Sequence, residues 1–133
     1  MKQRKRKFTG VVEVALLDPV KWEDRKISVV RLDFAKVTGK TLTDIDLALK
    51  NTGLDPDPYN LVTYQYIFQF AAAISGIPAR AFMKMSGDDA DAIWKVILGY
   101  RGGQSPQEVY DELCEDTDDN SDQDEEGFQS PAN

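Results

Sequence analysis

The chain has 133 residues, with 23 Asp and Glu against 16 Lys and Arg, and a formal net charge of −7. Its length suits a single domain. Histidine is absent and Cys114 is the one cysteine, which excludes His-based triads, imidazole metal sites, intramolecular disulfides and cysteine zinc sites.

The charges are separated along the chain. Residues 1–7 carry five bases and no acid, residues 108–126 carry eleven acids and no base, and the body between them is nearly neutral. A segment so polar and acidic cannot bury enough apolar area to offset the entropy of ordering it. We therefore expect a basic flexible N-terminus at 1–7, a folded domain at 8–103 and an acidic, mostly disordered tail at 104–133.

Two strands are predicted first, at 11–17 and 27–34, because both runs are rich in β-branched or large apolar residues. Pro19 lacks an N–H group and should end the first strand. The simplest pairing is an antiparallel hairpin with a loop of roughly nine residues. A lone hairpin is only marginally stable in water, so we expect helices to cover it.

The hydrophobic period then changes to that of helices. Thr41 or Thr43 is expected to cap a helix that runs to about Lys50, before a proline-rich connector at 55–58. Asn60 is expected to cap the most apolar element, a helix over 61–75 that Gly76 ends.

The remaining pattern predicts three shorter helical segments. Pro78 suits the first position of a helix over 78–85. Ser86, with Asp89 three residues on, has the spacing of a capping box before a helix that Gly102 and Gly103 close. One more short helix is expected at 104–114. The fold class is therefore α+β, an N-terminal antiparallel β-hairpin packed on a small bundle of three to five α-helices.

Catalytic and metal-binding motifs fit this sequence poorly. An EF-hand loop needs Gly at its sixth position and Glu at its twelfth, but a loop starting at Asp116 places Ser121 and Gly127 there. Acidic neighbours disfavour the thiolate of Cys114, and residues 99–103 lack the Lys and Ser/Thr of a phosphate loop. We expect no enzymatic activity, no cofactor and no bound metal.

The charge distribution of the sequence also argues against nucleic acid as a partner. The segments 78–85 and 88–100 are spaced like a helix-turn-helix unit, whose second helix would meet phosphates with its N-terminal end. That end carries Asp88, Asp89 and Asp91, which would repel them. The basic residues at 2–7 are more typical of a solubilising terminus.

Aromatic residues are concentrated in the helix expected at 61–75. One interpretation is an ordinary core, and the other is a partner groove or a self-association seam, since a small domain has difficulty burying every face of such a helix. Helical periodicity turns Tyr64 and Phe68 inward. It leaves Tyr66 and Phe70, four residues apart, as the candidate partner-binding residues.

The order of these elements resembles the phage tail assembly chaperones of Mu-like and related contractile-tailed phages. The resemblance covers about residues 11–102. It is carried by Val-Glu-Val-Ala-Leu-Leu-Asp-Pro-Val at 12–20, by Ile-Ser-Val-Val-Arg-Leu-Asp-Phe at 27–34, by the Ser-Gly-Ile-Pro turn at 75–78 and by the Asp-led helix from Asp89. The acidic tail lies outside it.

The resemblance implies a non-enzymatic, non-virion protein of the host cytoplasm that binds the tape measure protein and keeps it soluble until the tail tube polymerises. Many such proteins also have a longer form made by programmed ribosomal frameshifting, which would add the tail tube protein as a partner. A homo-oligomer is compatible with the sequence, and no membrane partner is expected because 61–77 is too polar to span a bilayer.

Two other functions stay open. An acidic protein that mimics nucleic acid and inhibits a DNA-binding protein would share the acidic tail, although such a protein needs its negative charge on the folded body. A small virion head or tail component is the other alternative.

Overall fold

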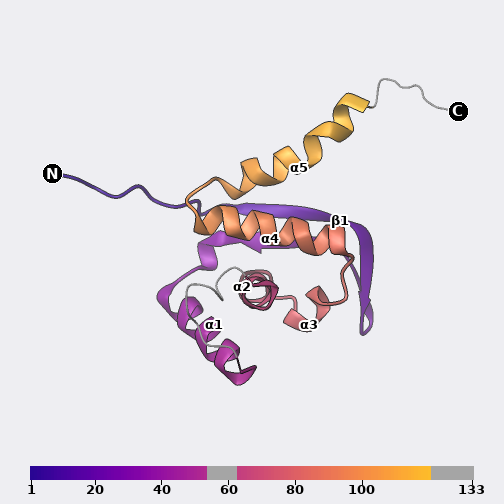
Figure 1. Cartoon of the computed structure of the whole chain (residues 1–133), viewed down its shortest axis with the longest axis horizontal. Coiled ribbons are helices and arrows are strands. Elements are labelled where there is room, and N and C mark those ends of the chain that lie inside the picture. The colour runs from indigo at the N-terminus through magenta and orange to yellow at the C-terminus, as the bar shows by residue number, and fades with distance from the viewer. Residues whose placement is uncertain (54–62, 121–133) are drawn as a thin grey trace, which may run out of the picture.

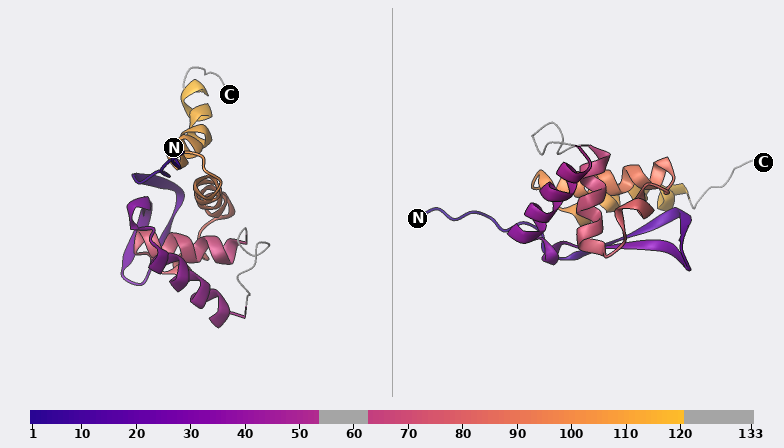
Figure 2. Two further views of the ribbon diagram at one scale, coloured as in Figure 1. Left: turned by 90° about the vertical axis from the view of Figure 1, so that its left-hand side faces the viewer. Right: turned by 90° about the horizontal axis from the view of Figure 1, so that it is seen from below.

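The structure is a computed structural model that describes residues 1–53 and 63–120, with side chains described to residue 114. Its elements follow the order β1, β2, a 3-10 turn and five α-helices, so the predicted α+β class is confirmed (Figure 1). The helices gather on one side of a long hairpin (Figure 2, right). In this arrangement α2 packs against β2, whereas α4 and α5 pack against β1.

The hairpin is longer and its turn tighter than the sequence indicated. Strand β1 spans Val11–Trp22 and strand β2 spans Arg25–Asp33, in antiparallel register with Val12 opposite Leu32 and Trp22 opposite Arg25. The turn consists of Glu23 and Asp24, and Glu23 adopts a left-handed φ of 55°. The predicted nine-residue loop is therefore wrong.

Pro19 does not end the first strand. The pairing register shifts between Ala15 and Val20, so Pro19 lies in an irregular stretch of the strand. At this position no hydrogen bond of the ladder requires a backbone N–H, which proline lacks. Pairing resumes at Val20 opposite Ile27. The proline was accommodated by a bulge, which the local sequence rules did not anticipate.

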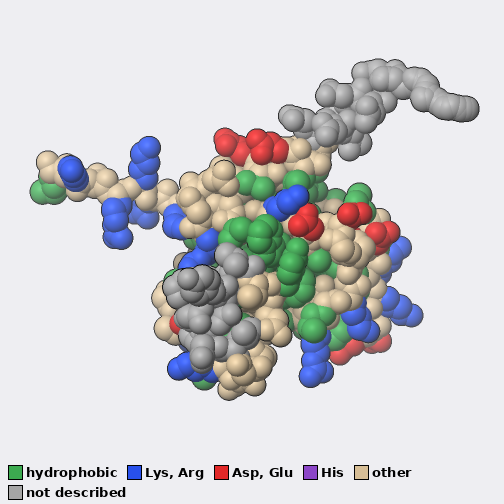
Figure 3. Space-filling view, viewed as in Figure 1, with side chains coloured by type: hydrophobic (Ala, Val, Ile, Leu, Met, Phe, Trp, Pro, Cys, Tyr) green, Lys and Arg blue, Asp and Glu red, His purple; other side chains and the backbone are tan. Residues whose placement is uncertain are grey.

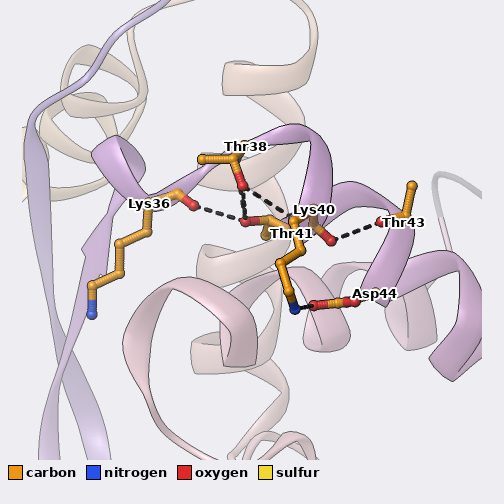
Figure 4. Close-up of polar contacts among 6 residues, drawn as sticks. All are labelled: Lys36, Thr38, Lys40, Thr41, Thr43 and Asp44. Carbon is orange, nitrogen blue, oxygen red and sulfur yellow. Dashed lines mark hydrogen bonds and ion pairs between the residues drawn. The ribbon is translucent and has the colours of Figure 1, made fainter.

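Helix α1 spans Gly39–Asn51 and begins earlier than either threonine predicted as its cap. Thr38 is the N-cap, and it forms a reciprocal pair with Thr41 (Figure 4). The Thr41 amide donates to the Thr38 hydroxyl at 3.3 Å, and the Thr38 amide donates to the Thr41 hydroxyl at 3.2 Å. Two threonines thus supply the capping box that usually needs a longer side chain.

Helix α2 spans Tyr64–Ser75, with Thr63 as its N-cap, and Gly76 ends it in the left-handed region at φ 78°, as predicted. The cap predicted at Asn60 and the connector at 55–58 lie outside the described residues. The Gly76 turn leads into α3, a single helical turn over Ala79–Phe82 that is shorter than the expected 78–85. Pro78 is the N-cap of α3 rather than its first residue.

Helix α4 spans Gly87–Arg101 and is capped by Ser86, whose hydroxyl accepts from the Asp89 amide, as predicted. The Asp89 carboxylate is not used within the helix. It accepts from the backbone amides of Leu17 and Asp18, at 2.9 Å and 3.0 Å, in the irregular stretch of β1. Asp89 is the only charged side chain buried among the described residues, so it joins hairpin to helices by charge-assisted hydrogen bonds.

Helix α5 spans Pro106–Asn120, beyond the short helix expected at 104–114. It packs on the body, because the Ala15 amide donates to the Tyr110 hydroxyl at 3.0 Å and Gly99 approaches Val109 closely. The packed part of the chain therefore continues past the expected domain end at residue 103. Residues 121–133 of the predicted disordered tail lie outside the described residues.

The core lies between the inner face of the hairpin and the helices. The largest of its fully buried side chains come from the hairpin, the 3-10 turn and helices α1 to α4, and they are Leu32, Phe34, Leu49, Ile67, Phe70, Ile74, Phe82, Ile93 and Ile97. Within the described ranges, 1–53 and 63–120, no helix is long and apolar enough to cross a membrane.

Candidate functional site: an apolar groove beside α2

The two residues predicted to contact a partner are core residues in this structure. Tyr66 is 2% exposed and Phe70 is fully buried, with their rings 6.1 Å apart. The Arg101 guanidinium lies 5.8 Å from both ring centroids. The expectation that Tyr66 and Phe70 face outward is therefore wrong.

The physical reason is the number of neighbours around α2. Strand β2 and helices α1, α3 and α4 all pack against it, so most of its circumference is covered. Both faces that periodicity distinguished are inside, because Ile67 and Ala71 are fully buried as well. Tyr64, predicted to point inward, is 46% exposed because it is the first residue of the helix and lies at its open end.

A groove opens where α1, α2 and α3 meet. Its volume is about 460 Å³, within the range usual for binding pockets. Apolar side chains dominate its walls, and the lining residues are Leu49, Thr52, Tyr64, Gln65, Phe68, Gln69, Ala79, Arg80 and Met83. We call this feature the α2 groove.

Two large apolar side chains of the α2 groove are exposed at its rim. Met83 is 68% exposed and Tyr64 is 46% exposed. Methionine is flexible and polarizable, which suits a surface that adapts to a partner.

The apolar surface continues beyond the groove. The Tyr64 ring lies 6.0 Å from that of Trp94 on α4. Trp94 in turn lines a second hollow of about 340 Å³ between α4 and α5, together with Leu98, Val109 and Leu113. Figure 3 shows the result as a band of hydrophobic side chains that runs from beside α5, across α4, towards α2 and α3.

Among the described residues that line the α2 groove, one is charged: Arg80, the second residue of α3. Its side chain forms no ion pair with any residue that the structure describes, whereas Arg31, Lys40 and Lys95 are each paired with a carboxylate. The other polar lining residues are the neutral Thr52, Gln65 and Gln69. The described lining of the groove therefore combines an apolar wall with the unpaired guanidinium of Arg80.

The other features of the described chain suit structural roles. No three His, Cys, Asp or Glu side chains come together as a metal site in the described part. Burial raises the pKa of Tyr66, and it also raises the pKa of Tyr100, which lies in the core below Lys7. Lys7 donates to the carbonyls of Tyr100 and Arg101, so the last base of the N-terminal segment caps the C-terminal end of α4.

Comparison with protein-family models, with curated proteins and with solved structures finds no match to this chain.

Proposed function

We propose that this protein is a phage tail assembly chaperone that binds a helical segment of the tape measure protein in the α2 groove. In this role it acts in the host cytoplasm, catalyses no reaction and keeps its partner soluble until the tail tube polymerises. The observation that carries the proposal is the exposed apolar surface formed by the groove and the band that continues it over Trp94. Grooves of this kind bind the apolar face of amphipathic helices.

The local sequence that carries the resemblance also builds the groove. The Ser-Gly-Ile-Pro turn at 75–78 ends α2 and starts α3. It thereby sets α3 beside α2, so that Ala79 and Met83 form one wall and Phe68 another. The motif has a structural purpose that fits a binding role.

Charge distribution supports solubilisation of a partner. The whole chain carries −7, and eleven of its acids are concentrated in residues 108–126. Such net charge opposes the association of complexes with one another. A frameshifted longer form, which the resemblance implies, would bring the tail tube protein to the same complex.

The test is co-expression with the tape measure protein, comparing two matched double variants. Tyr64→Ser with Met83→Ser removes exposed apolar side chains at the groove. Leu17→Ser with Val29→Ser removes exposed apolar side chains from the hairpin, where Leu17 is 74% and Val29 is 48% exposed. All four positions are exposed, so each substitution should change stability little.

The groove variant should lose co-purification and leave the tape measure protein in the pellet, while the hairpin variant keeps it soluble. Loss in both variants, or in neither, would contradict the proposed site. A wild-type chain that does not retain the tape measure protein would contradict the proposed function itself.

A further inference from the structure

We propose that Arg80 makes the α2 groove selective for an amphipathic helix that carries a carboxylate beside its apolar face. This inference rests on the proposed function and names the chemistry of the segment that the groove accepts. It makes Arg80 a specificity-determining residue rather than a general surface charge.

The first argument is the state of Arg80 in the described structure. It is exposed, lines the groove and has no carboxylate partner among the described residues. Arg31, in contrast, lies 4.0 Å from Glu13, and Lys95 lies 2.9 Å from Asp91. A guanidinium presents a planar set of donors that matches a carboxylate, and such charge-assisted pairs are stronger than neutral hydrogen bonds.

The second argument is that no acidic residue lines the groove among the residues that the structure describes. Its remaining polar residues, Thr52, Gln65 and Gln69, are neutral. The first turn of α2 contributes Tyr64 and Gln65 to the lining and contains no acidic residue, so the positive end of its dipole is not offset there. Both features favour a partner with negative charge and disfavour one with positive charge at this point.

The third argument is the position of Arg80 relative to the apolar wall. Phe68 and Met83 line the same groove, so a helix that places its apolar face against them would bring a flanking side chain towards Arg80. An opposite charge there fixes the register of the bound helix and raises the rate of association, which are the usual effects of rim charges.

The experiment uses the full chain and three synthetic amphipathic helical peptides of one length. The peptides are identical except for one residue flanking the apolar face, which is Glu, Gln or Lys. Fluorescence anisotropy at low and at high salt measures their affinities. The Glu peptide should bind about fivefold to tenfold more tightly than the Lys peptide, and added salt should reduce the difference.

Two charge-reversal variants provide the control. Arg80→Glu should invert the preference, so that the Lys peptide binds more tightly. Lys84→Glu makes the same change in charge four residues later, but Lys84 lies over the Trp22 ring at 5.4 Å and outside the groove lining. Lys84→Glu should keep the preference for Glu.

Several outcomes would overturn the inference. These are equal binding of the three peptides, no binding of any peptide, or the same change of preference in both variants. The proposed function is tested separately by the tape measure protein. If that protein is not retained but the Glu peptide is preferred through Arg80, the inference stands and the proposed function fails.

Discussion

Asp89 joins the hairpin to the helical layer through two charge-assisted hydrogen bonds to the backbone of β1. Its carboxylate oxygens accept separately from Leu17 and Asp18, at the point where the β1 ladder is irregular. Backbone amides that leave a ladder need another acceptor when they are buried. Asp89 supplies that acceptor, so the bulge that accommodates Pro19 depends on a residue seventy positions away in sequence.

Replacing Asp89 by Asn should lower the free energy of unfolding by about 2 kcal/mol, because Asn offers one acceptor and turns its amide donors toward the second N–H. Urea denaturation measures the change. Asp88→Asn is the matched control, since Asp88 lies in the same first turn but is exposed. Asp88→Asn should cost less than about 1 kcal/mol. Equal losses in the two variants would show that only the helix dipole is affected.

Tyr66 and Phe70 lead to a second prediction at the residue scale. Tyr66 is 2% exposed and Phe70 is 0% exposed, so truncating either ring leaves a cavity. Each truncation should lower the free energy of unfolding by roughly 3–5 kcal/mol. The double variant Tyr66→Ala, Phe70→Ala should therefore unfold a domain of typical stability. Loss of near-UV circular dichroism and of NMR dispersion would show this. A folded double variant would mean that the rings are not core residues.

Helix α5 is docked by a close approach of two helices. A Cβ atom added to Gly99 on α4 would lie 2.8 Å from Cγ2 of Val109 on α5, so either the Val109 side chain or one of the helices would have to shift. The Tyr110 hydroxyl, next along α5, accepts a hydrogen bond from the Ala15 amide of β1. The missing side chain of Gly99 thus lets the acidic helix α5 pack closely on α4, and the Tyr110 hydroxyl binds α5 to the hairpin.

Gly99→Ala should cost about 1–3 kcal/mol from overpacking, even though alanine favours helix, and it should speed hydrogen exchange at Val109 and Tyr110. Adding Val109→Ala removes the clashing atom and should recover part of the loss. A double-mutant cycle measured by urea denaturation gives the coupling. Additive effects of the two substitutions would contradict the packing described for α4 and α5.

At the scale of the whole molecule, buried tyrosines couple stability to alkaline pH. Burial raises the pKa of Tyr66 and of Tyr100 above the ordinary value of about 10. The folded state therefore keeps its phenol protons at a pH where the unfolded state releases them. The stabilising contribution is complete below pH ~10 and is lost as pH rises through the folded pKa values.

The free energy of unfolding should accordingly fall above pH ~10, and the fall should be shallower in Tyr66→Phe with Tyr100→Phe. Denaturant titrations across this range measure the slope, and phenolate absorbance follows ionisation. Exposed lysines titrate in the wild type and in the variant alike, so they do not affect the comparison. Identical slopes would contradict burial of the two phenols.

Local chemistry in the sequence determined the types and order of the elements. Runs of β-branched and large apolar residues identified both strands, Gly76 ended α2, and Ser86 capped α4. These signals act within a few residues, because caps, turns and periodicity depend on neighbouring backbone groups. The α+β class followed from them without tertiary information.

Only the tertiary structure decided which faces of those elements are available. Periodicity divided α2 into two apolar faces, but it could not show that four elements cover both faces. It therefore wrongly predicted that Tyr66 and Phe70 are exposed and that Tyr64 is buried. The groove residue Arg80 and the bond from Asp89 to β1 depend on segments distant in sequence. The physical reason is that burial is a property of all the neighbours of a side chain, whereas a helical pattern records only its own angle around one axis.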